Sequence, residues 1–211
     1  MLLPKQNEFG HKMIGEDMVK QYYHGTCTLG ISVLEARSLL HDTKEKVVYL
    51  TDSIPYALFY IWDAVHNDCN AKHVTGWMKD GIAYYEEQFP DQLKTFYQGV
   101  SGYLYGISDN ESIQSVGNRT NMFYCLGNVA VAETIHIPDV YDEMLKYELE
   151  GKLVVLRYNE QSPQRQNELI DLMARGIVRH AFYADNTQMK EFMKRNFIKA
   201  WERALLIKNS F

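Results

Sequence analysis

Three side chains in this chain of 211 residues, His24, Tyr49 and Glu133, carry groups that can bind or react with a ligand. His24 lies at the end of a strand-like run and precedes Gly25, which allows close backbone approach, and the hydroxyl of Thr26. Tyr49 has a similar place on a second such run. Glu133 lies in an apolar run, where a carboxylate needs a partner or a function. These residues are therefore the first candidates for a site.

Two strand–helix units are expected to position the first two candidates. Strands are predicted at Gln21–Thr26 and at Lys46–Thr51, which is rich in β-branched residues. Apolar residues at helical spacing predict a helix over residues 29–40 after the first strand. A second helix is predicted over residues 54–65, with Pro55 in its first turn, where proline is tolerated.

A separate strand, predicted over residues 130–137, carries the acid. Alternation along a strand places Val131, Glu133, Ile135 and Ile137 on one face, and the intervening side chains on the other. A lone carboxylate with apolar neighbours on its own face is the kind of group whose pKa and contacts are tuned. Glu133 is therefore a candidate functional acid, with a surface acid on an edge strand as the alternative.

The remaining pattern indicates an α+β fold. Strands over residues 73–78 and 82–87 flank Lys79-Asp80-Gly81, a strong hairpin signal. Because the strands do not alternate strictly with helices, mostly antiparallel, split sheets fit better than a doubly wound parallel sheet. The other predicted elements are a helix over 89–97, a strand over 100–107, a polar loop over 108–120, a strand over 121–125, a helix from Asp139 to about Glu150 closed by Gly151, a strand over 153–158, and helices from Pro163 onward.

Composition narrows the classes of protein. The chain is 46% hydrophobic and 23% charged, with no run of about 18 apolar residues, so no membrane span is predicted. The first 13 residues are too polar for a secretory signal. Three widely spaced cysteines make a poor disulfide framework and predict a reducing compartment, the cytoplasm. The net charge of −5 argues against nucleic acid as a partner, although a small anionic ligand is allowed.

The motifs resemble the ADP-ribosyltransferase superfamily, in particular its H-Y-E branch, which includes the poly(ADP-ribose) polymerases. The matching blocks are YHGT at residues 23–26, VYLT at 48–51 and AETI at 132–135. The family also has an aromatic residue eleven positions after the tyrosine, where this chain has Tyr60. The resemblance covers residues 21–158 in order, in short blocks.

The resemblance implies a fold and a substrate. The fold would be a split antiparallel β-sandwich of ADP-ribosyltransferase type that holds NAD, with peripheral helices. Residues 21–158 would form this core, after an N-terminal lead-in of residues 1–20. Residues 159–211 would form a helical C-terminal segment packed on the core.

The resemblance also implies roles for individual residues. Cleavage of the bond to nicotinamide creates an oxocarbenium-like centre, which a nearby carboxylate stabilises. The catalytic residue would be Glu133, which would also bond the nicotinamide ribose. The NAD-binding residues would be His24 at the adenosine ribose, Gly25 at the nicotinamide amide with Thr26 nearby, Tyr60 stacked on the nicotinamide ring and Tyr49 on its other side.

Alternatives remain at several positions. Tyr56 competes with Tyr60 as the stacking residue because it shares that helix face. Arg119 in the polar loop is interpreted as a solvated side chain, with a phosphate contact as the alternative. His66, Cys69 and His73 have metal-ligand spacing, but no fourth ligand is evident, so no metal site is predicted.

Three functions are compatible with this pattern. The first is an enzyme that cleaves NAD and passes ADP-ribose to an unknown acceptor or to water. The second is a catalytically inactive relative that binds a nucleotide or a protein, and the third is an unrelated α+β interaction module. Arginine-specific transferases carry an acid or glutamine two positions before their glutamate, where this chain has Val131, so arginine is not assigned as the acceptor. The enzyme hypothesis requires His24, Tyr49 and Glu133 to line one cleft.

Overall fold

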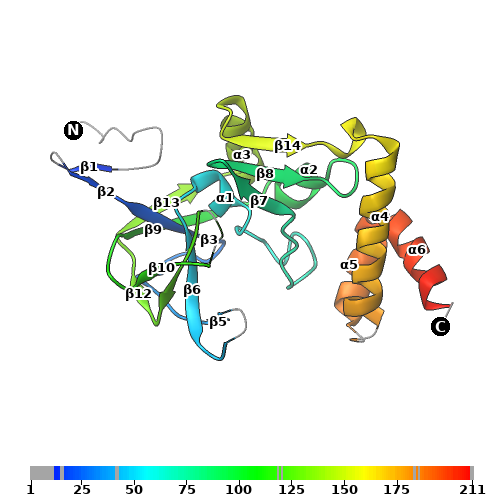
Figure 1. Cartoon of the computed structure of the whole chain (residues 1–211), viewed down its shortest axis with the longest axis horizontal. Coiled ribbons are helices and arrows are strands. Elements are labelled where there is room, and N and C mark those ends of the chain that lie inside the picture. The colour runs from blue at the N-terminus through cyan, green and yellow to red at the C-terminus, as the bar shows by residue number, and fades with distance from the viewer. Residues whose placement is uncertain are drawn as a thin grey trace.

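The candidate residues lie on the larger of two main sheets of a mixed α+β fold (Figure 1). The computed structural model describes residues 12–14, 17–40, 43–117, 119, 121–182, 184 and 186–209. The larger sheet has seven described strands, which pair antiparallel. In spatial order they are β10 (Ile113–Ser115), β11 (Met122–Leu126), β6 (Lys46–Thr51), β3 (Gln21–Thr26), β9 (Gly102–Ser108) and β13 (Glu133–Ile137), with β5 (Ser38–Leu39) also paired to β6.

A smaller sheet is built from a hairpin and one later strand. β7 (Gly76–Lys79) and β8 (Ile82–Glu86) are antiparallel, and β14 (Leu153–Leu156) lies parallel to β8. The predicted hairpin turn is confirmed, since Asp80 and Gly81 have φ of 51° and 77°, the left-handed values that a two-residue hairpin loop requires.

Helices connect and flank the two sheets. The short helix α1 (Ile54–Leu58) contacts strands of both sheets and so lies between them. Phe192 of α5 packs on Trp62 and Phe96 of the core. Figure 1 shows α4, α5 and α6 gathered at the C-terminal end of the molecule. The other helices are α2 (Gln92–Tyr97), α3 (Val140–Leu149), a 3-10 turn (Tyr158–Glu160), α4 (Pro163–Ile177), a π-helical turn (Val178–Phe182), α5 (Thr187–Asn196) and α6 (Ile198–Lys208).

Both faces of the larger sheet are covered, because successive side chains of a strand point to opposite sides. Tyr23 and Leu104 belong to the main core, which also includes α1, the smaller sheet and the C-terminal helices. Tyr22, Leu50 and Tyr105 belong to a second apolar cluster. Adjacent tyrosines, Tyr22 and Tyr23, thus enter different cores.

The helix predicted over residues 29–40 is wrong. This segment is extended and contains β4 (Val33–Leu34), which pairs with β12 (Val129–Ala130), and β5, which pairs with β6. Leu29, Val33 and Leu39 are 68%, 46% and 62% exposed, so its apolar residues do not form one buried helical face. Pairing with the distant strand β12 and with the adjacent strand β6 replaced the helical hydrogen bonds that the local pattern favoured.

Several other predicted elements also differ from the structure. α1 ends at Leu58 and not at residue 65. The buried side chains of Ile61 and Trp62 therefore belong to the turn that follows the helix. The strand predicted over 130–137 is split into β12 and β13. The loop predicted over 108–120 contains β10.

The N-terminal lead-in is only partly described. Its described parts include a two-stranded pair, β1 (Lys12–Ile14) with β2 (Asp17–Val19), which the sequence did not predict. The rest of the predicted lead-in, residues 1–11 and 15–16, lies outside the described residues. Among the described helices, none combines the length and apolarity that crossing a bilayer would require. Cys27, Cys69 and Cys125 all have free thiols.

Candidate functional site

A separation between two central strands creates the candidate site. β3 and β6 share the register pair Tyr23 with Thr51, and no further pair continues the ladder along these two described strands. Beyond that pair, the His24 ring bridges the strands, with Nδ1 at 3.0 Å from the carbonyl oxygen of Tyr49. A side chain therefore replaces a ladder bond where the sheet opens.

The opening leads into a cavity of about 430 Å³. Four of the predicted site residues, His24, Gly25, Tyr49 and Tyr60, line it. They come from β3, β6 and the turn after α1, so the structure brings together residues that are up to 36 positions apart in the sequence. The other lining residues are Tyr23, Ser38, Leu50, Thr51, Tyr56, Ala57, Lys72, Val116, Arg119 and Met122.

Gly25 permits the close contact between β3 and α1 that shapes this cavity. A Cβ atom at this position would lie 2.2 Å from the carbonyl oxygen of Ala57 and 3.1 Å from Ile61. Only a residue without a side chain allows the helix backbone to lie directly on the strand. The helix in turn carries Tyr56 and leads into Tyr60.

The two neighbouring tyrosines form an edge-to-face pair. Their ring centroids are 5.6 Å apart at 69°, and the hydroxyls of Tyr56 and Tyr60 are 3.2 Å apart. Tyr56 is only 5% exposed, whereas Tyr60 is half-buried and offers more of its ring to a ligand. Burial, followed by the charge of Tyr56, raises the pKa of Tyr60, so its phenol remains neutral. The hydroxyl of Tyr49 does not join this pair and instead donates a hydrogen bond to the carbonyl oxygen of Leu39 at 3.1 Å.

Thr26 lies in a neighbouring cavity of about 410 Å³, which shares His24 with the first. Its Oγ1 accepts a hydrogen bond from the backbone N–H of Thr28 at 3.2 Å. Thr28 and Ser32 also line this second cavity, together with an ion pair between Glu35 and Arg37. His24 therefore lies between the first cavity, which is lined by several tyrosines, and the second cavity, which is lined by threonine and serine hydroxyls.

Glu133 is not among the described residues that line these two cavities, whereas the sequence pattern predicted it in one cleft with His24 and Tyr49. It is half-buried, and β9 and β3 lie between its strand and β6. Three strand spacings separate it from β6, roughly 14 Å. Its carboxylate accepts a hydrogen bond from Nε2 of Gln21 at 2.9 Å, and Oε1 of Gln21 accepts one from the hydroxyl of Tyr23 at 3.3 Å.

Two cations in the cavity wall were not assigned to the site from the sequence. Lys72 lies in the segment between α1 and β7, and its ammonium donates a hydrogen bond to the carbonyl oxygen of Tyr60 at 3.0 Å. Arg119 is exposed, as the interpretation of a solvated side chain expected, and it also lines the cavity. Neither has a local motif, because both reach the site through tertiary contacts. Of the described residues that line this cavity, none is aspartate or glutamate.

The histidines that have metal-ligand spacing in the sequence, His66 and His73, contact other polar groups. Nε2 of His66 lies 3.0 Å from the carbonyl oxygen of Thr95, and Nε2 of His73 lies 2.9 Å from Oε1 of Gln88. In the described part of the chain, no group of three or more His, Cys, Asp or Glu residues is placed to hold a metal ion.

The protonation of His24 follows from its partner. A carbonyl oxygen can only accept, so neutral His24 carries its proton on Nδ1 and leaves Nε2 as an acceptor. Burial, which outweighs the opposing effect of the Tyr49 carbonyl, lowers the pKa of His24 from its ordinary 6.5, and the Lys72 charge acts in the same direction. Burial likewise lowers the pKa of His73.

These two lowered pKa values predict that acid destabilises the fold. Below pH 6.5 the unfolded chain takes up protons on both histidines while the folded chain resists, so stability is complete above that pH and falls below it. We expect a lower unfolding temperature at pH 5.5 than at pH 7.5, and a smaller difference for His24→Gln. His180→Gln, at an exposed position, is the matched control. An equal acid-induced loss in His24→Gln and the parent chain would contradict this assignment.

Comparison with known proteins identified no relative of this chain. No family model matches the chain. No curated protein and no solved structure matches it either. Its function is therefore argued from the chemistry and geometry of this site.

Proposed function

We propose that this chain binds NAD, or a nucleotide with the same ADP-ribose unit, in the cavity between β3 and β6. The observation that carries this proposal is that His24, Gly25, Tyr49 and Tyr60 line one cavity. These are the residues that the resemblance to ADP-ribosyltransferases assigns to NAD binding. The proposed fold is correspondingly a split β-sandwich, with the separation of β3 from β6 as the split.

The cavity has suitable partners for each part of such a ligand. The half-buried ring of Tyr60 is placed to stack on a planar base or nicotinamide. Nε2 of His24, as an acceptor, suits a ribose hydroxyl. The ring of Tyr49 forms part of the wall. The neighbouring cavity beyond His24 offers the hydroxyls of Thr26 and Thr28 to a second ribose.

We propose binding without cleavage, the second of the three functions. Cleavage of NAD at nicotinamide needs a carboxylate beside the developing positive charge. The described residues that line the cavity include no carboxylate, and Glu133, which is not among them, accepts a hydrogen bond from Gln21. This arrangement supports a catalytically inactive relative of the transferases over an active one.

Titration calorimetry with NAD and with ADP-ribose tests the binding proposal. We expect both to bind, and Tyr60→Ala to weaken both because the stacking surface is lost. Ligand at 100 times its dissociation constant should also raise the free energy of unfolding by about 2.7 kcal/mol. Absence of binding for both nucleotides would refute the proposal.

The substitution Glu133→Gln separates binding from catalysis. Since Glu133 lies outside the cavity, we expect this variant to bind NAD as the parent does, within about twofold. We also expect neither protein to release nicotinamide from NAD, measured by chromatography over several hours. Release by the parent that is lost in the variant would instead establish an enzyme with Glu133 as its catalytic residue.

A further inference from the structure

Lys72 and Arg119 are two positive charges in the cavity wall that have no ion-pair partner among the described residues. Several other arginines are ion-paired, for example Arg157 with Glu148 at 2.6 Å and Arg165 with Glu86 at 2.8 Å, although Arg175 and Arg179 have no such partner in the described part of the chain. The cavity contains no carboxylate among its described lining residues. The chain has a net charge of −5, yet the positive charge of this cavity is not neutralised by the described residues that line it.

Both charges lie close to Tyr60 but come from different parts of the chain. Nζ of Lys72 is 6.0 Å from the centre of the Tyr60 ring and 3.0 Å from its carbonyl oxygen. Arg119 is near enough to counteract the rise in the Tyr60 pKa, and the Lys72 charge also acts on His24. Both cations thus lie near the Tyr60 ring, and Lys72 also acts on the His24 imidazole, the two groups that the proposed ligand would contact.

The donors of both side chains are suited to phosphate. An ammonium has three donors, and Lys72 uses one of them on the Tyr60 carbonyl, which fixes its position and leaves two. A guanidinium offers a planar set of donors that matches two phosphate oxygens at once. A cavity lined by one sign of charge also raises the local concentration of the oppositely charged ligand.

We propose that Lys72 and Arg119 form a phosphate subsite that holds the pyrophosphate of the bound nucleotide beside Tyr60 and His24. This inference rests on the proposed function and narrows it to ligands with a diphosphate, as opposed to nucleosides or free nicotinamide. The subsite is built from the segment after α1 and the loop before β11, neither of which carries a matched motif of the family.

Calorimetry with ADP-ribose, adenosine and inorganic pyrophosphate tests this subsite. We expect Lys72→Gln and Arg119→Gln each to weaken ADP-ribose binding by about 10- to 100-fold, the loss typical of a hydrogen bond to a charged group. Adenosine, which has no phosphate, should bind all variants within about twofold. Lys72→Arg, which keeps the charge, should recover most of the affinity.

Two exposed cations provide matched controls. Lys79→Gln and Arg179→Gln remove the same charges at exposed positions that do not line the cavity, and both should bind ADP-ribose as the parent does. Equal losses for adenosine and ADP-ribose in Lys72→Gln and Arg119→Gln would overturn the subsite in favour of a structural role. Parent-like ADP-ribose affinity in both variants would also overturn it.

The two proposals fail in distinguishable ways. If the parent binds ADP-ribose and the cation variants do so equally well, the subsite is wrong and the proposed function stands. If the parent binds pyrophosphate through Lys72 and Arg119 but neither NAD nor ADP-ribose, the anion site stands and the proposed function is wrong. If the parent binds none of these compounds, both are overturned.

Discussion

Replacing Gly25 with alanine is expected to lower the free energy of unfolding by about 3 kcal/mol, the upper end of the usual cost of overpacking. The added Cβ would lie 2.2 Å from the carbonyl oxygen of Ala57, and both are held by backbone, so neither can move alone. Relief requires α1 to move away from β3. Since α1 carries Tyr56 and leads into Tyr60, ligand binding should be lost as well.

Urea unfolding monitored by circular dichroism measures the effect of Gly25→Ala, and Gly176→Ala is its control. Gly176 lies inside α4, and a Cβ there would meet no atom within 4 Å. Alanine is favoured over glycine in a helix interior, so Gly176→Ala should stabilise the chain by about 0.5–1 kcal/mol. Parent-like stability of Gly25→Ala would contradict the close contact of β3 with α1.

Replacing Glu87 with alanine is expected to be the most destabilising change, at roughly 2–6 kcal/mol for two buried donors left without partners. Glu87 is only 3% exposed, and its carboxylate accepts hydrogen bonds from the backbone N–H groups of Leu93 and Tyr158, both at 3.1 Å. It thereby joins the start of α2 to the chain that follows β14. Glu87→Gln keeps one acceptor oxygen and should lose about half as much.

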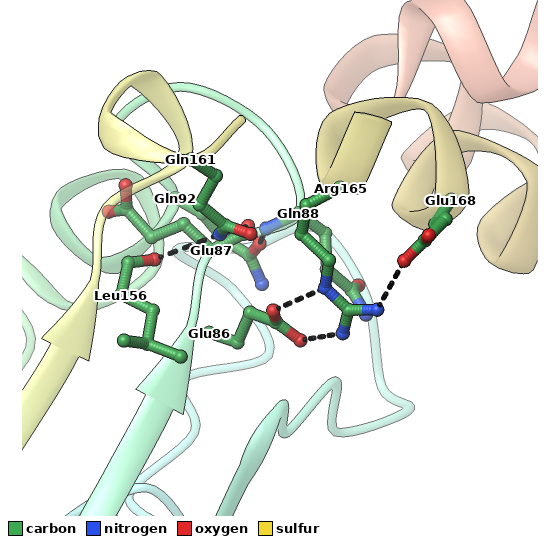
Figure 2. A network of polar contacts seen from close by, with 8 residues as sticks. All are labelled: Glu86, Glu87, Gln88, Gln92, Leu156, Gln161, Arg165 and Glu168. Carbon is green, nitrogen blue, oxygen red and sulfur yellow. Dashed lines mark hydrogen bonds and ion pairs between the residues drawn. The ribbon is translucent and has the colours of Figure 1, made fainter. Parts of the chain in front are cut away.

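The surrounding network supplies a control for Glu87. Figure 2 shows Arg165 between Glu86 and Glu168, and Glu86 directly precedes Glu87 in the chain. Glu168 is exposed and its bond to Arg165 is 3.1 Å long, so Glu168→Ala should change the urea midpoint little. A similar midpoint for Glu87→Ala and Glu168→Ala would refute the role assigned to the buried carboxylate.

The sequence alone determined those features that depend on neighbouring residues. The strands Gln21–Thr26 and Lys46–Thr51 have the predicted bounds, and the Asp80-Gly81 turn has the predicted geometry. The helix α3 begins after Asp139, whose side chain accepts from the Asp142 N–H, and is followed by Gly151 with φ of 71°. Strand propensity, turn conformation and capping act over a few residues, so a local pattern suffices to predict them.

Only the tertiary structure decided which candidates share a cavity. His24 and Tyr49 meet because β3 and β6 separate after one register pair, and Glu133 is excluded because two strands lie between β13 and β6. Lys72 and Arg119 arrive from segments with no recognisable motif. Strand order and register depend on pairing between residues far apart in the chain, which local periodicity does not encode. The sequence thus indicated which types of residue could form the site, whereas the assembled sheet decided which of them line the cavity.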